Sequence, residues 1–222
     1  MNESQKAEEL RRRLSGWGNE NIRDFPWRRT YDPYSLLVAE FMLHRTQASQ
    51  VLTVYNCFLN LYPDLKTFAN ARADNVRQIL EPLGLQWRIE AMINALFNLW
   101  EKFGKVPLYY ASLVSIGGIG PYIAGATICF SLNKPLALVD TNTVRVIGRI
   151  FGMKTDAGAR RRQGMVKTIK KACDIKNPRK YYYSMIDLAH SICNTSKPQC
   201  VECPLLGVPC SFGQIRTSTK KE

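Results

Sequence analysis

The sequence predicts an all-α protein. Apolar residues recur at three- and four-residue spacing along most of the 222-residue chain, which is typical of helices with one buried face. Few stretches alternate with a period of two, and turn pairs such as Asn-Gly, which join hairpin strands, are absent. A chain of this length can bury a core in one large domain or two small ones.

The first half of the chain predicts four helices. Residues 1–20 are rich in charge and predict an exposed helix. Residues 34–62 carry helical spacing over a length that suits two helices. Residues 74–84 predict a short helix that Pro82 and Gly84 stop.

The second half predicts three more helices and one short strand. Residues 88–104 form an amphipathic pattern that ends at Gly104, a common helix terminator. Residues 122–132 and 141–151 also have helical spacing. The segment "KPLALVD", residues 134–140, is long enough for one short strand.

The charge of the chain favours a nucleic-acid partner. The net charge is +13, from 31 basic and 18 acidic residues, which suits nucleic acid or an anionic membrane. No apolar run reaches the ~18 residues of a membrane span, and the N-terminus lacks the apolar core of a signal peptide. We therefore expect a cytoplasmic protein without membrane partners. Residues 154–180 hold ten basic and two acidic residues, which suits either a solvated face or a phosphate-binding surface.

Four of the seven cysteines cluster near the C-terminus. They follow the pattern C-x6-C-x2-C-x6-C, in which the central pair can bind one metal centre and proline-containing loops bring the outer pair to it. Four thiolates suit a structural zinc or a [4Fe–4S] cluster, and the single compact run favours iron–sulfur. The alternative is four unrelated cysteines. Cys57, Cys129 and Cys173 are expected in the core; the clustered four are Cys193, Cys200, Cys203 and Cys210.

A glycine-rich turn precedes the helix predicted at 122–132. The segment "SIGGIG" allows a tight turn at Gly118 and Gly120, and Ile116 and Ile119 are suited to fixing the turn to the core. Amide groups at the start of the next helix would then form an anion site.

Asp140 lies twenty residues after Gly120, directly before the helix predicted at 141–151. An aspartate at this position can cap the helix, because its carboxylate accepts hydrogen bonds from the first free amides. Whether Asp140 also does chemistry is not decided by its position alone.

These motifs together resemble the helix-hairpin-helix DNA glycosylases of the endonuclease III superfamily. The hairpin, the aspartate and the cysteine run occur in that order. The segment "FPWRRTYDPYSLLVAEFMLHRTQASQV" at residues 25–51 is similar to the matching segment of adenine mismatch glycosylases, with its Pro-Trp-Arg, Asp-Pro-Tyr and Met-Leu-x-x-Thr-Gln. The similarity covers roughly residues 22–212.

The resemblance implies two helical domains with a DNA-binding cleft between them. Residues 29–136 would form a six-helix barrel domain with the hairpin, and residues 1–28 with 137–222 would form the domain of a [4Fe–4S] cluster. The four clustered cysteines would bind that cluster. The family commonly has five residues between its last two cysteines, whereas six lie between them here, at 204–209.

The resemblance also implies roles for three catalytic residues. Asp140 matches the aspartate that stabilises the cationic sugar as the base leaves a flipped-out nucleotide. Tyr122 occupies the place where bifunctional members carry a lysine nucleophile, so base removal without strand cleavage is expected. Glu40 matches the glutamate that protonates a departing adenine; the alternative is a buried structural acid.

Further residues match the family's DNA contacts. Arg45 could present two donors to an orphan guanine or bind only phosphate. The expected contacts are the hairpin residues Gly118, Ile119 and Gly120, the gap-filling residues His44 and Arg45, and the opposing wedge Leu85 and Gln86.

The length of the chain and Tyr122 favour the thymine-DNA mismatch glycosylases. The chain ends twelve residues after Cys210, whereas adenine glycosylases carry a further domain there. We therefore expect a monomeric enzyme that removes thymine or uracil opposite guanine in double-stranded DNA. The alternatives are an adenine glycosylase, a non-catalytic DNA-binding module and an electron carrier. Asp140 argues against the module, and the hairpin and charge argue against the carrier.

Overall fold

The computed structural model describes residues 1–206, 208 and 210–213, and this part of the chain is helical, as predicted. Within these residues no strand forms, and the one β-bridge joins Leu206 to Val208. No described helix has both the length and the apolar character that crossing a membrane requires.

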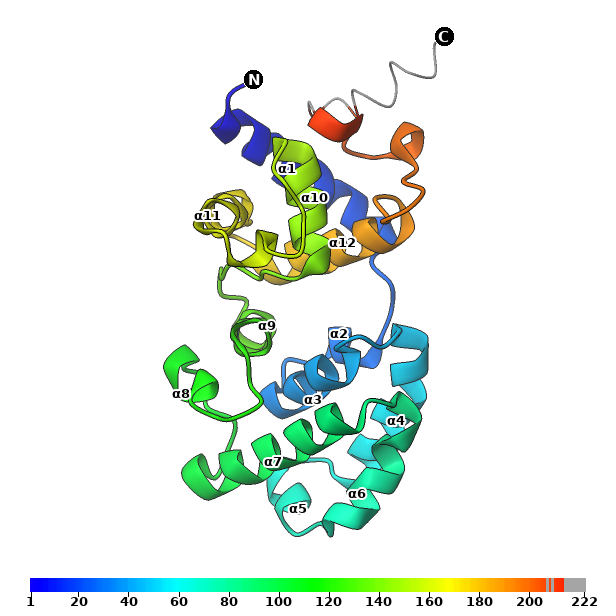
Figure 1. The fold of residues 1–222 in the computed structure, drawn as a ribbon, viewed down its shortest axis with the longest axis vertical. Helices are drawn as coiled ribbons and strands as arrows, with labels where there is room; N and C mark the ends of the chain where they lie inside the picture. The colour runs from blue at the N-terminus through cyan, green and yellow to red at the C-terminus, as the bar shows by residue number, and fades with distance from the viewer. Residues whose placement is uncertain (207, 209, 214–222) are drawn as a thin grey trace. The chain divides into compact units, whose positions relative to one another are not determined.

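The chain folds as two compact units (Figure 1). Unit 1 combines Met1–Arg23 with Asn133–Glu222, and unit 2 is Asp24–Leu132. These limits lie a few residues from the domain boundaries expected at 28 and 136.

Unit 1 packs four longer helices around an apolar core. The N-terminal α1 (Glu3–Asn21) lies against α12 (Pro178–Ser191) and α11 (Gln163–Ala172), and α10 (Thr141–Phe151) packs on the same two helices. Two short 3-10 turns complete the described part of the unit: η2 (Ala159–Arg161) lies between α10 and α11, and η3 (Cys200–Glu202) follows α12. The buried side chains include Leu10, Leu14, Ile147, Met165, Tyr181 and Met185.

Unit 2 contains the remaining helices. α3 (Pro33–Leu43) packs against α4 (Ala48–Leu61), α7 (Gln86–Phe103) and α9 (Pro121–Leu132). The other elements, in chain order, are α2 (Pro26–Arg29), α5 (Leu65–Ala69), α6 (Ala73–Leu80), η1 (Glu81–Leu83) and α8 (Tyr110–Val114). Every residue from Ala124 to Ser131 is buried, so α9 is the central helix of this unit.

The predicted helix ends match the structure closely. α6 runs into η1, which contains Pro82 and ends at Gly84. Gly104 caps α7 with a φ of 64°, a left-handed conformation that glycine adopts without steric cost. The N-terminal segment is a helix as expected, but it is not simply exposed, since Ala7, Leu10 and Leu14 are buried.

Two expectations from the sequence are wrong. Residues 134–140 do not form a strand; instead the Tyr182 hydroxyl accepts from the amide of Leu138 (3.1 Å) and donates to the carbonyl of Leu136 (2.7 Å). This tyrosine takes the place of a neighbouring strand as hydrogen-bond partner. Cys57 is exposed on α4 rather than in the core, whereas Cys129 and Cys173 are buried as expected.

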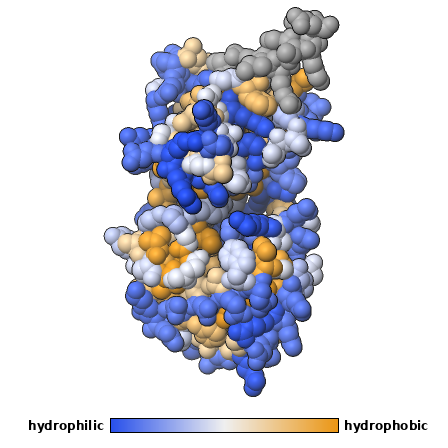
Figure 2. Space-filling model, viewed as in Figure 1, coloured by the Kyte–Doolittle hydropathy of each residue, from blue (hydrophilic) through white to orange (hydrophobic). Residues whose placement is uncertain are grey.

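On the face drawn in Figure 2, the surfaces of the two units differ in hydropathy. Hydrophilic residues dominate the part of this face that belongs to unit 1, and patches of hydrophobic residues interrupt the surface of unit 2. Exposed large apolar side chains of unit 2 include Tyr31, Leu85, Trp87, Tyr109 and Tyr110.

Candidate active site

The glycine-rich turn joins α8 to α9 and forms a helix-hairpin-helix. Ile116 and Ile119 are buried at 5% and 4% exposure, so both side chains fix the turn to the core as predicted. Gly118 has a φ of 88°, and a Cβ there would lie 2.9 Å from the carbonyl oxygen of Ala91 on α7. Only glycine fits this position without strain. Open space surrounds Gly120 instead, so the chain can be approached there from outside.

Asp140 caps α10 through a reciprocal capping box. Its Oδ1 accepts from the amide of Thr143 (2.7 Å) and from the Thr143 hydroxyl (2.8 Å), while the Asp140 amide bonds the same hydroxyl. The other oxygen, Oδ2, accepts from Nδ2 of Asn142 (2.9 Å). Asp140 is therefore a helix cap, and neighbours fix both carboxylate oxygens in one orientation.

A chain of polar contacts leads from Asp140 to the cysteine segment. Asn142 accepts through Oδ1 from Nη2 of Arg145 (3.1 Å), and the same guanidinium donates to the carbonyls of Ala189 (2.9 Å) and Cys193 (2.8 Å). Burial lowers the pKa of Arg145 from its usual value. The sequence reasoning missed Asn142 and Arg145, although both lie within five residues of the capping aspartate on the helix it begins.

Two of the clustered cysteine sulfurs accept hydrogen bonds from N–H groups. Arg149 donates to Sγ of Cys193 (3.2 Å), and the Gly213 amide donates to Sγ of Cys210 (3.4 Å). Burial, assisted by the charges of Cys193, Cys210 and Cys200, raises the pKa of Cys203 to about 11.

The Arg149 guanidinium and the Gly213 amide are N–H donors to sulfur, which is the kind of contact that iron-bound thiolates use. Among the residues that the structure describes, no group of three or more His, Cys, Asp or Glu side chains is arranged to hold a metal ion. The donor chemistry fits a thiolate-bound group, and its identity stays a prediction.

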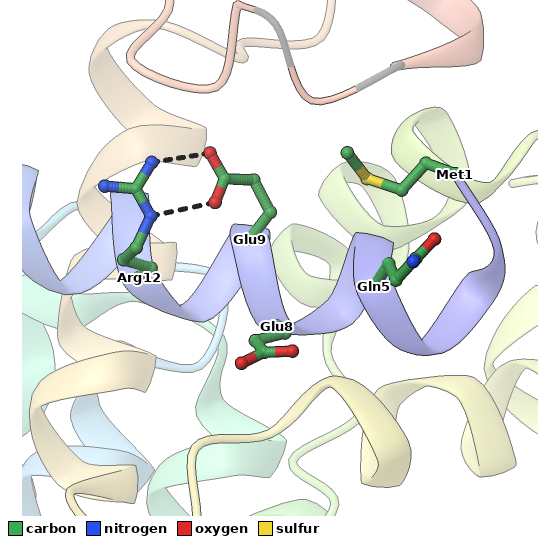
Figure 3. A pocket seen from close by; sticks show the side chains of 5 residues that line it. All are labelled: Met1, Gln5, Glu8, Glu9 and Arg12. Carbon is green, nitrogen blue, oxygen red and sulfur yellow. Dashed lines mark hydrogen bonds and ion pairs between the residues drawn. The ribbon is translucent and has the colours of Figure 1, made fainter.

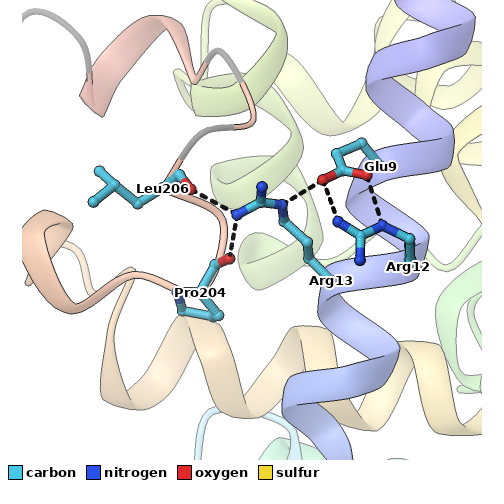
Figure 4. Close-up of polar contacts among 5 residues, drawn as sticks. All are labelled: Glu9, Arg12, Arg13, Pro204 and Leu206. Atoms are coloured by element: carbon cyan, nitrogen blue, oxygen red, sulfur yellow. Dashed lines mark hydrogen bonds and ion pairs between the residues drawn. The ribbon is translucent and has the colours of Figure 1, made fainter.

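Arg13 ties the loop after Cys203 to α1 (Figure 4). Its Nη1 donates to the carbonyls of Leu206 (2.7 Å) and Pro204 (3.4 Å). Its Nε pairs with Glu9 (2.5 Å), which also accepts from Arg12. Hydrogen bonds from Arg12 and Arg13 lower the pKa of Glu9 to about 2. Arg13 of the N-terminal helix thus bonds directly to the segment between the last two cysteines, which is one residue longer than is common in the family.

Two of the expected catalytic residues belong to unit 2, whereas Asp140 belongs to unit 1. Glu40 lies on α3 at 7% exposure, and Tyr122 is half-buried at the second position of α9. Because α3 packs against α9, the structure places these two on neighbouring helices.

The expected gap-filling residues and the expected opposing wedge lie on two exposed tips of unit 2. His44 and Arg45 are exposed in the loop 44–47 between α3 and α4, which we call the first tip. Leu85 and Gln86 are exposed in the turn 83–86 that leads into α7, which we call the second tip. The rings of His44 and Trp87 meet edge to face with centroids 6.1 Å apart, so the two tips adjoin.

The basic segment 154–180 is largely exposed. Of its ten basic residues, Arg179 is buried and Lys180 is half-buried; the other eight are exposed. The exposed set is Lys154, Arg160, Arg161, Arg162, Lys167, Lys170, Lys171 and Lys176. Exposure is compatible with both earlier interpretations, a solvated face or a phosphate-binding surface.

A shallow pocket lies on α1, far along the chain from the residues expected at the active site (Figure 3). It contains none of the residues expected at the active site. Its lining is Met1, Gln5, Glu8, Glu9 and Arg12.

Comparisons with known proteins show the family of this chain. Residues 38–171 match the family described as "HhH-GPD superfamily base excision DNA repair protein". A thymine-DNA glycosylase of Aeropyrum pernix is 35% identical over 206 residues, 90% of this chain and 92% of the relative. A thymine/uracil-DNA glycosylase of Pyrobaculum aerophilum is 30% identical over 87% of this chain and 86% of the relative.

A solved structure and a second group of relatives extend the comparison. The structure of a thermostable thymine-DNA glycosylase superposes with a TM-score of 0.88 at 26% identity, covering 95% of this chain and 98% of that one. Adenine DNA glycosylases also match; one from Buchnera aphidicola is 29% identical over 82% of this chain but only 52% of its own length.

The chain therefore belongs to the HhH-GPD superfamily of base excision DNA repair proteins, as the sequence motifs indicated. Within that superfamily it is a DNA N-glycosylase, a hydrolase of the bond between base and deoxyribose.

Proposed function

We propose that this glycosylase removes thymine and uracil mispaired with guanine and leaves the DNA strand intact. The observation that carries the proposal is the similarity over nearly the whole chain to thymine and thymine/uracil glycosylases. The adenine glycosylase relative, by contrast, has about half of its length outside the match.

The proposed reaction begins when the mispaired nucleotide leaves the base stack. An enzyme that works on the glycosidic bond needs the nucleotide extruded from the duplex, and a mismatched base costs the least to extrude. The first and second tips would fill the space that the base leaves. The hairpin at Gly118 and Gly120 and the exposed basic residues of 154–180 would bind backbone phosphates through amides and charges.

Asp140 would then stabilise the transition state. As the bond from C1′ to the base N1 breaks, its electrons leave with the base and positive charge develops on the sugar. A negative oxygen held in place stabilises that charge without having to reorganise. The bonds from Thr143 and Asn142 support this role, since they fix the orientation of the carboxylate before substrate binds.

Water completes the proposed reaction. Its oxygen bonds to C1′, one of its protons passes to Asp140 and the departing base takes up a proton from solvent, which gives an abasic site and a free base. Tyr122 has no amine and cannot form a Schiff base with the sugar, so no strand cleavage follows. Glu40 would contact the base edge or hold water.

We further propose that Cys193, Cys200, Cys203 and Cys210 bind a [4Fe–4S] cluster. Four deprotonated thiols repel each other, and a bound cluster would remove that cost. The hydrogen bonds to sulfur from Arg149 and Gly213 support the assignment. The cluster would stabilise the fold around α10, and the base chemistry would be carried out by the protein's own side chains.

A second candidate substrate is adenine opposite guanine or oxidised guanine. Glu40 favours it, because this residue is buried on α3 at the position of the adenine glycosylases' proton donor. We rank it second because the full-length relatives act, by their names, on thymine and uracil.

The direct test uses end-labelled duplexes with G·T, G·U, A·G or matched pairs. After incubation, alkali cuts the strand at abasic sites. We expect cleavage of G·T and G·U strands at the mismatched pyrimidine. Cleavage of A·G alone would establish the second candidate, and uncut duplexes with cluster-loaded, folded protein would contradict both.

A further inference from the structure

Arg88 is a buried arginine on the first turn of α7. Its exposure is 3%, although its neighbours Gln86 and Trp87 are exposed. Among the described residues no carboxylate forms an ion pair with it, and burial alone lowers its pKa. Burying a charge without an opposite charge is costly, so an apolar residue would fill this position more favourably. The guanidinium therefore needs an explanation beyond packing.

The guanidinium bonds both exposed tips at once. Nη1 donates to the carbonyl oxygen of His44 and to the hydroxyl of Thr46 (2.7 Å), both in the first tip. Nη2 donates to the carbonyl oxygens of Leu83 (2.8 Å) and Gly84 (3.4 Å), both in the second tip. One planar side chain thus joins segments about forty residues apart in the sequence.

These bonds surround two residues in an unfavourable backbone conformation. Arg45 has a φ of 65° and Leu85 a φ of 54°, in the left-handed region that non-glycine residues rarely adopt. Arg88 bonds the peptide carbonyl directly before each of them. Such conformations persist where the surroundings enforce them, and they cluster at sites of function.

We propose that Arg88 is a positioning residue that holds the two tips in one fixed arrangement for insertion into mismatched DNA. The inference rests on the proposed function, in which both tips occupy the space left by the extruded base. If the tips moved independently, each would have to be ordered when DNA binds, and extrusion would be less favourable. With Arg88 in place, that ordering is complete before binding.

The proposal predicts a selective defect that simple destabilisation would not produce. Uracil opposite guanine must be extruded from a paired stack, whereas uracil opposite a tetrahydrofuran abasic analogue has no partner to leave. Loss of the fixed arrangement of the tips should therefore slow excision of uracil opposite guanine much more than excision of uracil opposite the abasic analogue. A protein that is merely less well folded would lose activity on both equally.

The test compares single-turnover excision by Arg88→Lys and Arg88→Met with wild type on both substrates. Lysine keeps the charge but cannot make the four-way contact. Thr46→Val removes one acceptor and keeps the shape. Arg77→Lys is the matched control: this arginine of the adjacent helix α6 bonds the side chains of Glu90 and Asp74 rather than either tip.

We expect both Arg88 variants to lose about tenfold or more in rate on the G·U duplex and about twofold or less on the abasic-opposed uracil. Thr46→Val should fall between wild type and these variants, and Arg77→Lys should match wild type. Equal losses on both substrates, or no loss on G·U, would overturn the positioning role. Wild-type protein that excises no base at all would instead contradict the proposed function.

A second measurement detects base extrusion directly, so it does not depend on the rate of excision. In the Asp140→Asn background, 2-aminopurine beside the mismatch reports extrusion by its fluorescence without excision. Arg88→Lys should reduce that signal at saturating protein while its melting temperature and its binding of matched DNA stay near those of its parent. An unchanged signal would overturn the proposal.

Discussion

Replacing Arg145 with methionine removes the guanidinium that connects the start of α10 to the cysteine segment. The three shortest of its hydrogen bonds are lost, to the Cys193 carbonyl (2.8 Å), the Ala189 carbonyl (2.9 Å) and Oδ1 of Asn142 (3.1 Å). A hydrogen bond from a charged donor contributes ~1.5–3 kcal/mol when its loss leaves a buried partner. Because Arg145 is half-buried, water replaces part of the loss, and we expect about 3 kcal/mol for the three contacts together.

This loss should be visible in both stability and rate. For a chain of this size, about 3 kcal/mol corresponds to a melting temperature lower by roughly 6–12 °C. Asn142 loses its anchor, and with it Asp140 loses the fixed donor at Oδ2. We expect single-turnover excision to fall by about tenfold at a temperature where the variant is fully folded.

Arg149→Met is the matched control, since Arg149 bonds Cys193 and Asn194 rather than Asn142. It should lower the melting temperature and the retention of the proposed cluster while the rate of the folded, loaded fraction stays near wild type. Equal rates in folded Arg145→Met and wild-type protein would refute the idea that Arg145 and Asn142 orient Asp140.

Three shorter predictions follow from the same geometry. Product strands should stay whole until alkali is added, and borohydride should trap no protein–DNA adduct; a strong adduct would show that some lysine acts as a nucleophile in place of Tyr122. Purified protein should contain about four irons per chain, and Cys203→Ser should lose iron and stability together; zinc without iron after anaerobic purification would contradict the cluster. Log affinity for DNA should fall with log salt by roughly 0.9 for each phosphate bound, and replacing the exposed Lys167 and Lys170 with alanine should reduce that slope; an unchanged slope would mean that this face is only solvated.

The helices of this protein could be predicted from its sequence because local rules determine them. Pro82, Gly84 and Gly104 end helices where backbone chemistry requires an end. Asp140 followed by Thr143 forms a capping box, a pattern that lies within four residues of sequence.

The errors arose where a distant partner decides the outcome. The 134–140 segment has strand-like composition, but Tyr182, over forty residues later, satisfies its backbone. The four acceptors of Arg88 lie on two tips that only the fold brings together, so no local pattern could reveal that contact. For the same reason the sequence indicated Asp140 but not Arg145, whose main partners lie 44 and 48 residues away.

The most direct test of the proposed mechanism is single-turnover excision of thymine from a G·T duplex by Asp140→Asn. Asparagine caps a helix about as well as aspartate, so it can keep the bond to the Thr143 amide while removing the negative charge. We expect a folded protein that binds the G·T duplex and excises about a thousandfold more slowly, a loss of ~4 kcal/mol in transition-state stabilisation. The melting temperature should stay within a few degrees of wild type, since the cap alone contributes ~1 kcal/mol. Excision near the wild-type rate by a well-folded Asp140→Asn variant would show that Asp140 only caps α10.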